Sequence, residues 1–332
     1  MLRGLDQWSQ ELRLASPDSG RFKWQIGGIY FDSRDMTEFD QRAYFLTSNA
    51  LGTTPNPNNW VLLHNVNTSW GLFGQASYDL TEKLRVTGGV RVTNDTKTTE
   101  LLKTADTVAG AVTFPATAAR KVRLSDTQPS FDLSLLYRAT PDLSLFARVA
   151  RGFRGPTIQG RSAVFNSPFS TAQSEKNTSW EAGVKSAWLD NALTFNLTGF
   201  YYTVSDIQLN GNDSNGNGVL FNADKAVGYG MEAELGLRPA RNLKFNIGFS
   251  LLHTEIKDKS VYAQAGAAGG ALSETVLNPT VRVGNNYFAQ INGNPLPNAP
   301  DFNLNVSGRY DLPLNEKLRA FVGADFNLQG YT

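Results

Sequence analysis

The stretch Asn242-Leu-Lys-Phe-Asn-Ile-Gly-Phe-Ser-Leu-Leu-His253 decides the fold class. Apolar residues alternate in it with polar or small ones, and this period of two is the pattern of a β-strand with one apolar face and one polar face. The same alternation recurs at 84–92, 191–201, 231–238 and 301–310, whereas helical periodicity is nearly absent. The sequence therefore predicts an all-β protein.

The connections between the predicted strands alternate in length. Short turns built from Pro, Asp, Asn and Gly lie at 16–20, 80–83, 139–142, 189–191, 239–242 and 313–317. Much longer connections separate these hairpins, at about 33–67, 97–125, 154–175, 206–225 and 256–300. Six hairpins predict about twelve antiparallel strands, each of roughly 9 to 14 residues.

Short turns at one end and long loops at the other are typical of antiparallel transmembrane β-barrels, whose strands need about 9–11 residues to cross. Tyr78, Tyr137, Trp188 and Tyr310 each precede a short turn on the apolar face, as an aromatic girdle would. A soluble β-sandwich or propeller also alternates, but its strands average about 5–6 residues. The pattern favours the membrane barrel.

Composition excludes several classes of function. The 332 residues contain no cysteine, so there is no disulfide, zinc–thiolate site or thiol nucleophile. His64 and His253 are the only histidines, which leaves no multi-histidine metal site. A net charge of +1 gives no basic footprint for nucleic acid. We find no catalytic motif, so the sequence predicts a protein that is not an enzyme and has no cofactor.

Several stretches, in this order and spacing, resemble the barrel of TonB-dependent outer-membrane receptors. They are Trp8-Ser-Gln-Glu-Leu-Arg-Leu-Ala-Ser-Pro17, Gly20–Trp24, Gly27–Phe31, Ala150–Arg154, Glu175–Lys185, Leu189–Asn191, Phe200–Tyr202, Asp206–Gln208, Asn222–Ala226, Gly230–Glu234 and Pro297–Pro300. The resemblance covers essentially the whole chain. It implies that residues 1–332 are part of a 22-stranded barrel domain, without the plug domain, the coupling segment and the last strands of such receptors.

The resemblance also implies a function and partners. Such receptors lie in the outer membrane of Gram-negative bacteria and take up a scarce ligand, such as a ferric siderophore, by active transport. The expected partners are outer-membrane lipid and lipopolysaccharide, a small-molecule ligand such as a metal chelate, and the TonB–ExbB–ExbD system, reached through the N-terminal part of the parent protein. No nucleic acid partner is expected.

Two other functions stay open at this point. A complete twelve-stranded outer-membrane barrel would be a passive, porin-like channel or a membrane-embedded hydrolase, and the hydrolase would need a catalytic constellation that the sequence lacks. A soluble β-rich binding protein is the third possibility.

The candidate ligand-binding residues lie in the long connection at 154–175. Arg154 and Arg161 belong to a basic run that suits an anionic ligand, and Phe165 and Phe169 are able to stack on one. A solvated or lipopolysaccharide-facing loop base explains the arginines equally well. On the lumen face, Glu232 and Glu234 fit an ion-paired wall better than a ligand site.

A candidate calcium loop begins at Asp213. Asp213, Asn215 and Asn217 occupy positions 1, 3 and 5 of the spacing D-x-N-x-N-G-x5-D, and Asp224 occupies position 12. The flanking residues are predicted strands rather than helices, so an ordinary Asn- and Gly-rich surface loop is the alternative. Structural Ca2+ is a hypothesis here.

Overall fold

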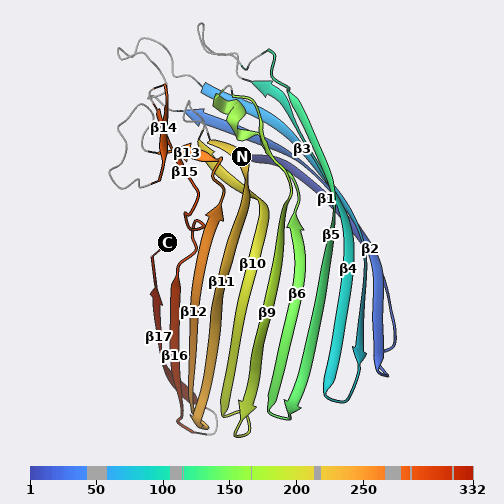
Figure 1. The fold of residues 1–332 in the computed structure, drawn as a ribbon, viewed down its shortest axis with the longest axis vertical. Helices are drawn as coiled ribbons and strands as arrows, with labels where there is room; N and C mark the ends of the chain where they lie inside the picture. The colour runs from blue at the N-terminus through green and yellow to red at the C-terminus, as the bar shows by residue number, and fades with distance from the viewer. Residues whose placement is uncertain are drawn as a thin grey trace.

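The computed structural model describes residues 1–42, 58–104, 114, 116–165, 167–212, 218–265, 278–284, 286–315 and 318–331. Its main element is a 12-stranded sheet in which every neighbouring pair is antiparallel and strand order follows the chain (Figure 1). The strands are β1 (Leu2–Ala15), β2 (Phe22–Arg42), β3 (Asn58–Asp79), β4 (Leu84–Thr104), β5 (Lys121–Thr140), β6 (Leu143–Arg154), β9 (Glu175–Trp188), β10 (Leu193–Asn212), β11 (Gly218–Ala240), β12 (Leu243–Lys257), β16 (Phe302–Pro313) and β17 (Arg319–Gln329).

Smaller elements lie in two of the long connections. Between β6 and β9, strands β7 (Thr157–Gln159) and β8 (Ser170–Ala172) form a hairpin around the 3-10 helix η2 (Arg161–Phe165). Between β12 and β16, strands β13 (Tyr262–Gln264), β14 (Thr280–Val283) and β15 (Asn286–Gln290) form a three-stranded sheet. No helix among the described residues is long and apolar enough to cross a membrane.

All six predicted short turns are confirmed as connections between neighbouring strands of the sheet. In the turn after Trp188, three consecutive residues have a left-handed backbone: Leu189, Asp190 and Asn191 have positive φ angles of 57°, 52° and 64°. Asn and Asp tolerate this left-handed conformation better than other non-glycine residues, whereas Leu189 does not, and its side chain is 76% exposed. The turn chemistry of Asp190 and Asn191 therefore favours a hairpin at this position.

The predicted strand lengths are wrong for half of the sheet. Strands β2, β3, β4, β5, β10 and β11 contain 20 to 23 residues. They continue far into the connections predicted at 33–67, 97–125 and 206–225. In these extensions backbone pairing continues while the outward side chains become mostly polar, so the outward apolar alternation that marks the spanning part is lost although the strand persists. Hydroxyl ladders replace it, as between Thr96 and Ser125, whose side-chain oxygens are 2.8 Å apart.

The outward face of the sheet carries two rows of aromatic side chains. One row lies beside the short turns and includes Phe22, Tyr78, Tyr137, Trp188 and Tyr310; the other includes Trp8, Tyr30, Trp70, Trp180, Tyr201, Tyr229 and His253. On β2, β3 and β9 the two rows are eight residues apart, which is about 26 Å along a strand. With a tilt of about 40° the rows bracket about 20 Å of thickness, near the height of the apolar band of outer-membrane barrels. The aromatic girdle predicted at the short turns is therefore confirmed, and the structure has a second girdle nearer the long connections.

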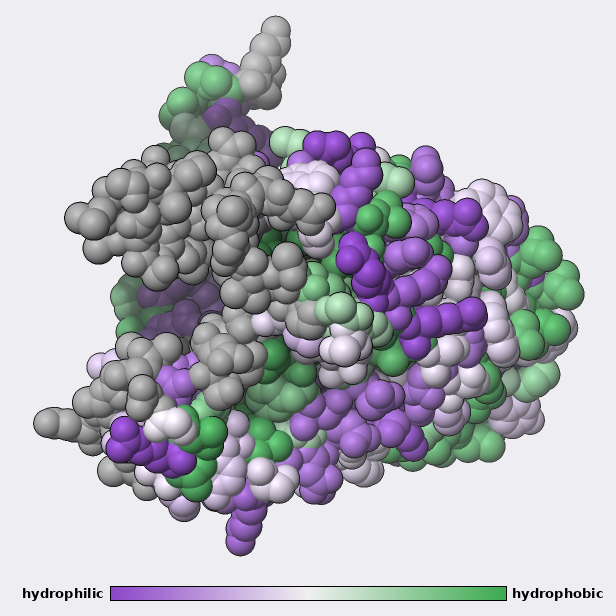
Figure 2. Space-filling view, turned by 90° about the horizontal axis from the view of Figure 1, so that it is seen from above, coloured by the Kyte–Doolittle hydropathy of each residue, from purple (hydrophilic) through white to green (hydrophobic). Residues whose placement is uncertain are grey.

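The described sheet is open. No ladder among the described residues joins β1 to β17, so each has one strand neighbour in this sheet. The end from which the long connections leave is seen in Figure 2, where hydrophilic side chains cover much of the surface and hydrophobic ones lie mostly toward the margin.

Candidate functional site

The inward face of the sheet is polar toward the short turns and carries apolar clusters toward the long connections. Near the short turns it forms a groove of about 590 Å3 across β10, β11, β12, β16 and β17. Amide and carboxylate side chains line this groove, namely Asn196, Glu234, Asn246, Asn305, Asp325 and Asn327. Glu234 accepts a hydrogen bond of 3.2 Å from the Asn196 amide. These polar side chains are suited to contact water and polar solutes on the inward side of the sheet.

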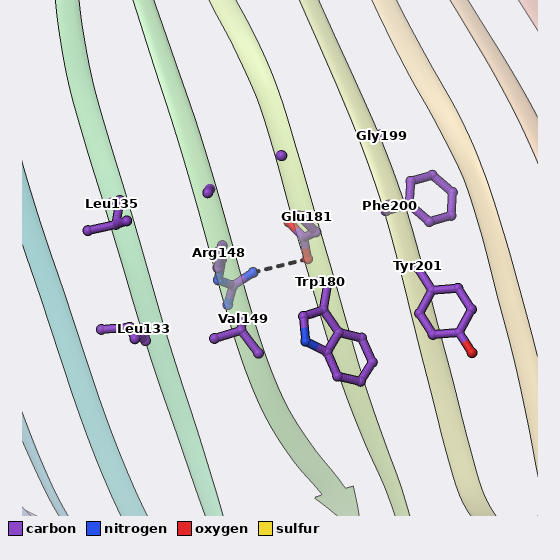
Figure 3. A pocket seen from close by; sticks show the side chains of 11 residues that line it. Leu133, Leu135, Arg148, Val149, Trp180, Glu181, Gly199, Phe200 and Tyr201 are labelled. Carbon is purple, nitrogen blue, oxygen red and sulfur yellow. Dashed lines mark ion pairs between the residues drawn. The ribbon is translucent and has the colours of Figure 1, made fainter.

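Charged side chains connect neighbouring strands on the same inward face. Arg148 on β6 lies 2.5 Å from an Asp132 carboxylate oxygen on β5, and its Nη1 atom lies 3.5 Å from Glu181 Oε1 on β9, the pair marked in Figure 3. Arg13 on β1 and Arg91 on β4 both lie near the Phe73 ring on β3. The guanidinium carbon of each arginine is 6.0 Å from the centroid of that ring. These pairs are partly exposed, so each contributes little to stability, but together they fix the charge pattern of the wall.

Residues 155–165 and 167–174, here called the β7–β8 segment, fold back onto the inward face at the long-connection end. Ala163 and Val164 of η2 are almost fully buried against Val61 and Leu63 of β3 and Leu101 of β4. Because odd-numbered residues of β3 and β4 share the inward face with Phe73 and Arg91, this apolar contact lies inside the curve of the sheet. The segment is thus a packed part of the wall.

Two side chains on neighbouring strands hold the ends of the β7–β8 segment. Gln208 on β10 donates to the carbonyls of Gly155 and Gln173, both at 2.9 Å, and accepts from the Thr157 hydroxyl at 2.8 Å. Asn222 on β11 donates to the Gln173 carbonyl at 3.0 Å and accepts from the Gln173 amide at 2.7 Å. Gln208 is 8% exposed, so its hydrogen bonds are shielded from water.

Residues 258–265, 278–284 and 286–300, here called the β13–β15 segment, pack on the next strands along. Ile291 of this segment is buried in a second apolar cluster with Val204, Ala226 and Ile256. Asp258, the first residue of the β13–β15 segment, is 7% exposed. The Asp258 carboxylate accepts from the amide and hydroxyl of Ser260 at 2.7 and 2.6 Å, and from the Asp224 amide of β11 at 2.8 Å.

These contacts set the protonation of Asp258. Burial alone would raise the pKa of this carboxyl, but the hydrogen bonds from Ser260, Asp224 and Val261 outweigh burial and hold the pKa below its usual value. The ionised carboxylate is therefore the form that anchors the segment.

The predicted ligand-binding residues lie on or beside the β7–β8 segment. Arg154, at the end of β6, places Nη1 3.7 Å from Glu175 Oε1, and Arg161 is exposed in η2. Phe169 packs against Phe114, with ring centroids 6.3 Å apart, as part of the first apolar cluster. The backbone of Phe165 belongs to η2, while its side chain lies outside the described part of the chain. Their role in ligand binding stays a prediction.

The candidate calcium residues Asp213, Asn215 and Asn217 lie outside the described residues. Asp224, the fourth, lies within β11, where its backbone amide is bonded to Asp258. Among the residues that the structure describes, no group of three or more His, Cys, Asp or Glu side chains is arranged to hold a metal ion. The Ca2+ hypothesis stays untested.

Sequence reasoning missed the residues that organise this end of the sheet. Gln208 and Asn222 lie in two of the stretches that carry the family resemblance, Asp206–Gln208 and Asn222–Ala226, so a signal was present. Asp258 had no such signal, because its partners in β11 and at Ser260 come together only in the folded chain.

Comparison with known proteins agrees with this architecture. The family model for the β-barrel of TonB-dependent receptors matches residues 2–332. The ferric yersiniabactin uptake receptor of Yersinia pestis is 18% identical, with a TM-score of 0.67, and the match covers 98% of this chain and 43% of that one. The siderophore receptor of Acinetobacter baumannii is 15% identical, with a TM-score of 0.64 and coverage of 97% and 46%. The copper transporter OprC is 15% identical, with a TM-score of 0.60 and coverage of 92% and 42%.

The chain spans less than half the length of each of these solved structures. At such identities the likeness shows the fold alone; the matched structures themselves are named as two receptors and a transporter. The family model is the stronger finding because it covers nearly every residue. This chain belongs to the TonB-dependent receptor β-barrel family and is an outer-membrane protein of a Gram-negative bacterium.

Proposed function

We propose that this chain forms part of the barrel wall of a receptor that takes up a scarce ligand, such as a ferric siderophore, across the outer membrane. The observation that carries the proposal is the family match over residues 2–332. The similar structures named for ferric yersiniabactin and for siderophores support this ligand class. The similarity to a copper transporter supports the wider class of metal chelates.

The architecture is consistent with gated uptake. The β7–β8 and β13–β15 segments pack on the strands at the long-connection end, where a ligand from outside would arrive. We propose that the complete receptor engages the TonB–ExbB–ExbD system, which supplies the energy. The open strand order of the described sheet gives no specific support to a closed twelve-stranded channel.

Uptake of radiolabelled ferric chelates into iron-starved cells tests the proposal. Cells carrying the complete gene should accumulate one class of chelate, and deletion of the gene or of tonB should abolish accumulation. A proton uncoupler should have the same effect as deletion. Accumulation that persists with the uncoupler, or conductance of small salts through the purified protein in planar bilayers, would instead establish a passive pore.

A further inference from the structure

A second groove, of about 460 Å3, crosses the inward face of the sheet from β1 to β6. Phe73 on β3 lies in this groove, three residues from Trp70 of the aromatic row nearer the long connections and five from Tyr78 of the row beside the short turns. Two arginines, Arg13 from β1 and Arg91 from β4, line the groove beside the Phe73 ring. The groove therefore places two guanidinium groups on the inward wall at the depth of the membrane.

Arg91 is the inward-facing charge of this groove that has no carboxylate within ion-pair distance among the described residues. Arg13 lies 2.6 Å from Glu11 Oε1, and Arg148, at the far side of the groove, is paired as described above. Arg91 instead donates from Nε to the neutral Thr93 hydroxyl at 2.8 Å. A guanidinium held in the lumen without a counter-charge suits an anionic group, which it binds with two parallel hydrogen bonds.

Two glycines let this arrangement lie flat against the sheet. A Cβ atom built on Gly71 would lie 2.9 Å from Arg91 Nη2 and 3.0 Å from its Nε, so the guanidinium rests on the backbone of β3. A Cβ atom built on Gly27 would lie 2.5 Å from Phe73 Cζ, so the ring rests in the same way on β2. Glycine inside a strand commonly marks such a close approach. The space above both groups is left to the groove.

The two guanidinium groups are close enough to contact one ligand. Each guanidinium carbon lies 6.0 Å from the centroid of the Phe73 ring, so the two carbons are at most twice that distance apart. Arg13 uses its Nε atom for Glu11 and Arg91 uses its Nε atom for Thr93, which leaves the terminal nitrogen atoms of both side chains as donors. Two planar donor groups beside one ring suit a multivalent anion.

We propose that Arg91 and Arg13 determine the charge specificity of uptake by binding an anionic group of the ligand on the wall of the lumen. This inference rests on the proposed function, because it concerns the same ligand. A multivalent anionic chelate gains the contact with Arg91, whereas a neutral chelate of similar size does not. Since the groove lies at the depth of the membrane, the pair acts on a ligand that has already passed the segments at the long-connection end.

Arginine labelling of the purified complete receptor tests the anion site without transport. Phenylglyoxal modifies guanidinium groups, and mass spectrometry follows the rate at each arginine while pyrophosphate, the probe, is titrated. Pyrophosphate should protect Arg91 and Arg13 together and leave Arg241, exposed in a short turn, unprotected. R91Q should raise the pyrophosphate concentration that half-protects Arg13 about tenfold, as expected for loss of one charge-assisted contact. R91K, which keeps the charge without the planar donor group, should raise it less.

A matched pair of glycine variants tests whether the position of the guanidinium matters. G71A keeps Arg91 but displaces the flexible end of its side chain, so it should weaken the protection of Arg13 while the chain still folds. G89A adds the same methyl group to the inward face of β4, where the nearest atoms lie 3.5 Å from the new Cβ, and should leave protection unchanged. A heat-shift gel confirms folding of each variant. Equal protection in all variants, or an equal loss in G71A and G89A, would overturn the proposal.

Uptake by cells tests the link between the anion site and specificity. R91Q should lower the ratio of uptake of an anionic ferric chelate to that of a neutral ferric chelate of similar size about tenfold, at concentrations below saturation. An unchanged ratio would overturn the role in specificity. Protection by pyrophosphate in a receptor that takes up no chelate would refute the proposed function while supporting the anion site, so the two failures are distinguishable.

Discussion

The β7–β8 and β13–β15 segments both pack on the strands at the long-connection end, but different chemistry anchors them. Neutral amides hold the first, through Gln208 and Asn222. A single buried carboxylate, Asp258, holds the start of the second. Each segment also covers an apolar cluster of similar composition. The difference lies in the polar anchor, and it predicts that the two segments respond differently to substitution and to acid.

Replacement of Gln208 should have the largest effect. Q208L leaves the carbonyls of Gly155 and Gln173 without this partner in a site shielded from water, which costs about 2–3 kcal/mol of local stability. Hydrogen–deuterium exchange should increase in residues 155–174 and stay unchanged in residues 258–265. Q7L on β1 is the control, because the Gln7 side chain has no hydrogen-bond partner among the described residues. Exchange unchanged in Q208L would mean that the apolar cluster alone holds the segment.

Replacement of Asp258 should give the opposite pattern. D258N removes the charge from a carboxylate that accepts four hydrogen bonds, and one oxygen becomes an NH2 group facing donors. A loss of about 2 kcal/mol follows, with faster exchange at Ser260 and Val261 and no change in residues 155–174. D142N, in a short turn at the other end of the sheet, is the matched control. A response shared by both segments would show that they unfold as one unit.

The comparison also shows what could be predicted from sequence. The period of two in 242–253 and 301–310 correctly predicted strands that cross the membrane, and the turn residues correctly predicted the hairpins. Both signals could be read from the sequence because each depends only on residues close together in the chain. The extensions of β2 to β5, β10 and β11 were missed, because their outward side chains are mostly polar and the apolar alternation that marks a membrane-crossing strand stops before them. Strand pairing rather than hydropathy determines their length.

The candidate site was predictable only in part. Arg154, Arg161 and Phe169 were chosen as chemical types in a long connection, and the structure places them on one packed segment. Nothing in the sequence near 154–175 indicates that the segment is held by Gln208, more than thirty residues away. Hydrogen bonds from a side chain to a distant backbone have no local pattern, so this part of the site required the fold.

Acid should separate the two anchors without any substitution. The pKa of Asp258 is lower in the folded chain than its ordinary value of 3.8. Its stabilising contribution is therefore complete above the unfolded value and is lost as the pH falls through the folded value. Below about pH 3.8, limited proteolysis with pepsin should cut the β13–β15 segment before the β7–β8 segment, and in D258N this order of cleavage should no longer depend on pH. Simultaneous cleavage of both segments in the natural chain would contradict it.

The smallest expected effect concerns Thr157, which tests whether Gln208 acts as a network or as separate bonds. T157V keeps the shape of the side chain but removes the hydroxyl that donates to Gln208 Oε1 at 2.8 Å. If the bonds are independent, the loss is about 1 kcal/mol, and exchange increases mainly at the β7 end of the segment. T171V, the same change on β8 at a hydroxyl without a bonded partner among the described residues, is the control. A loss in T157V as large as that in Q208L would mean that the Thr157 bond fixes the orientation of the amide, so that all the anchoring bonds form or break together.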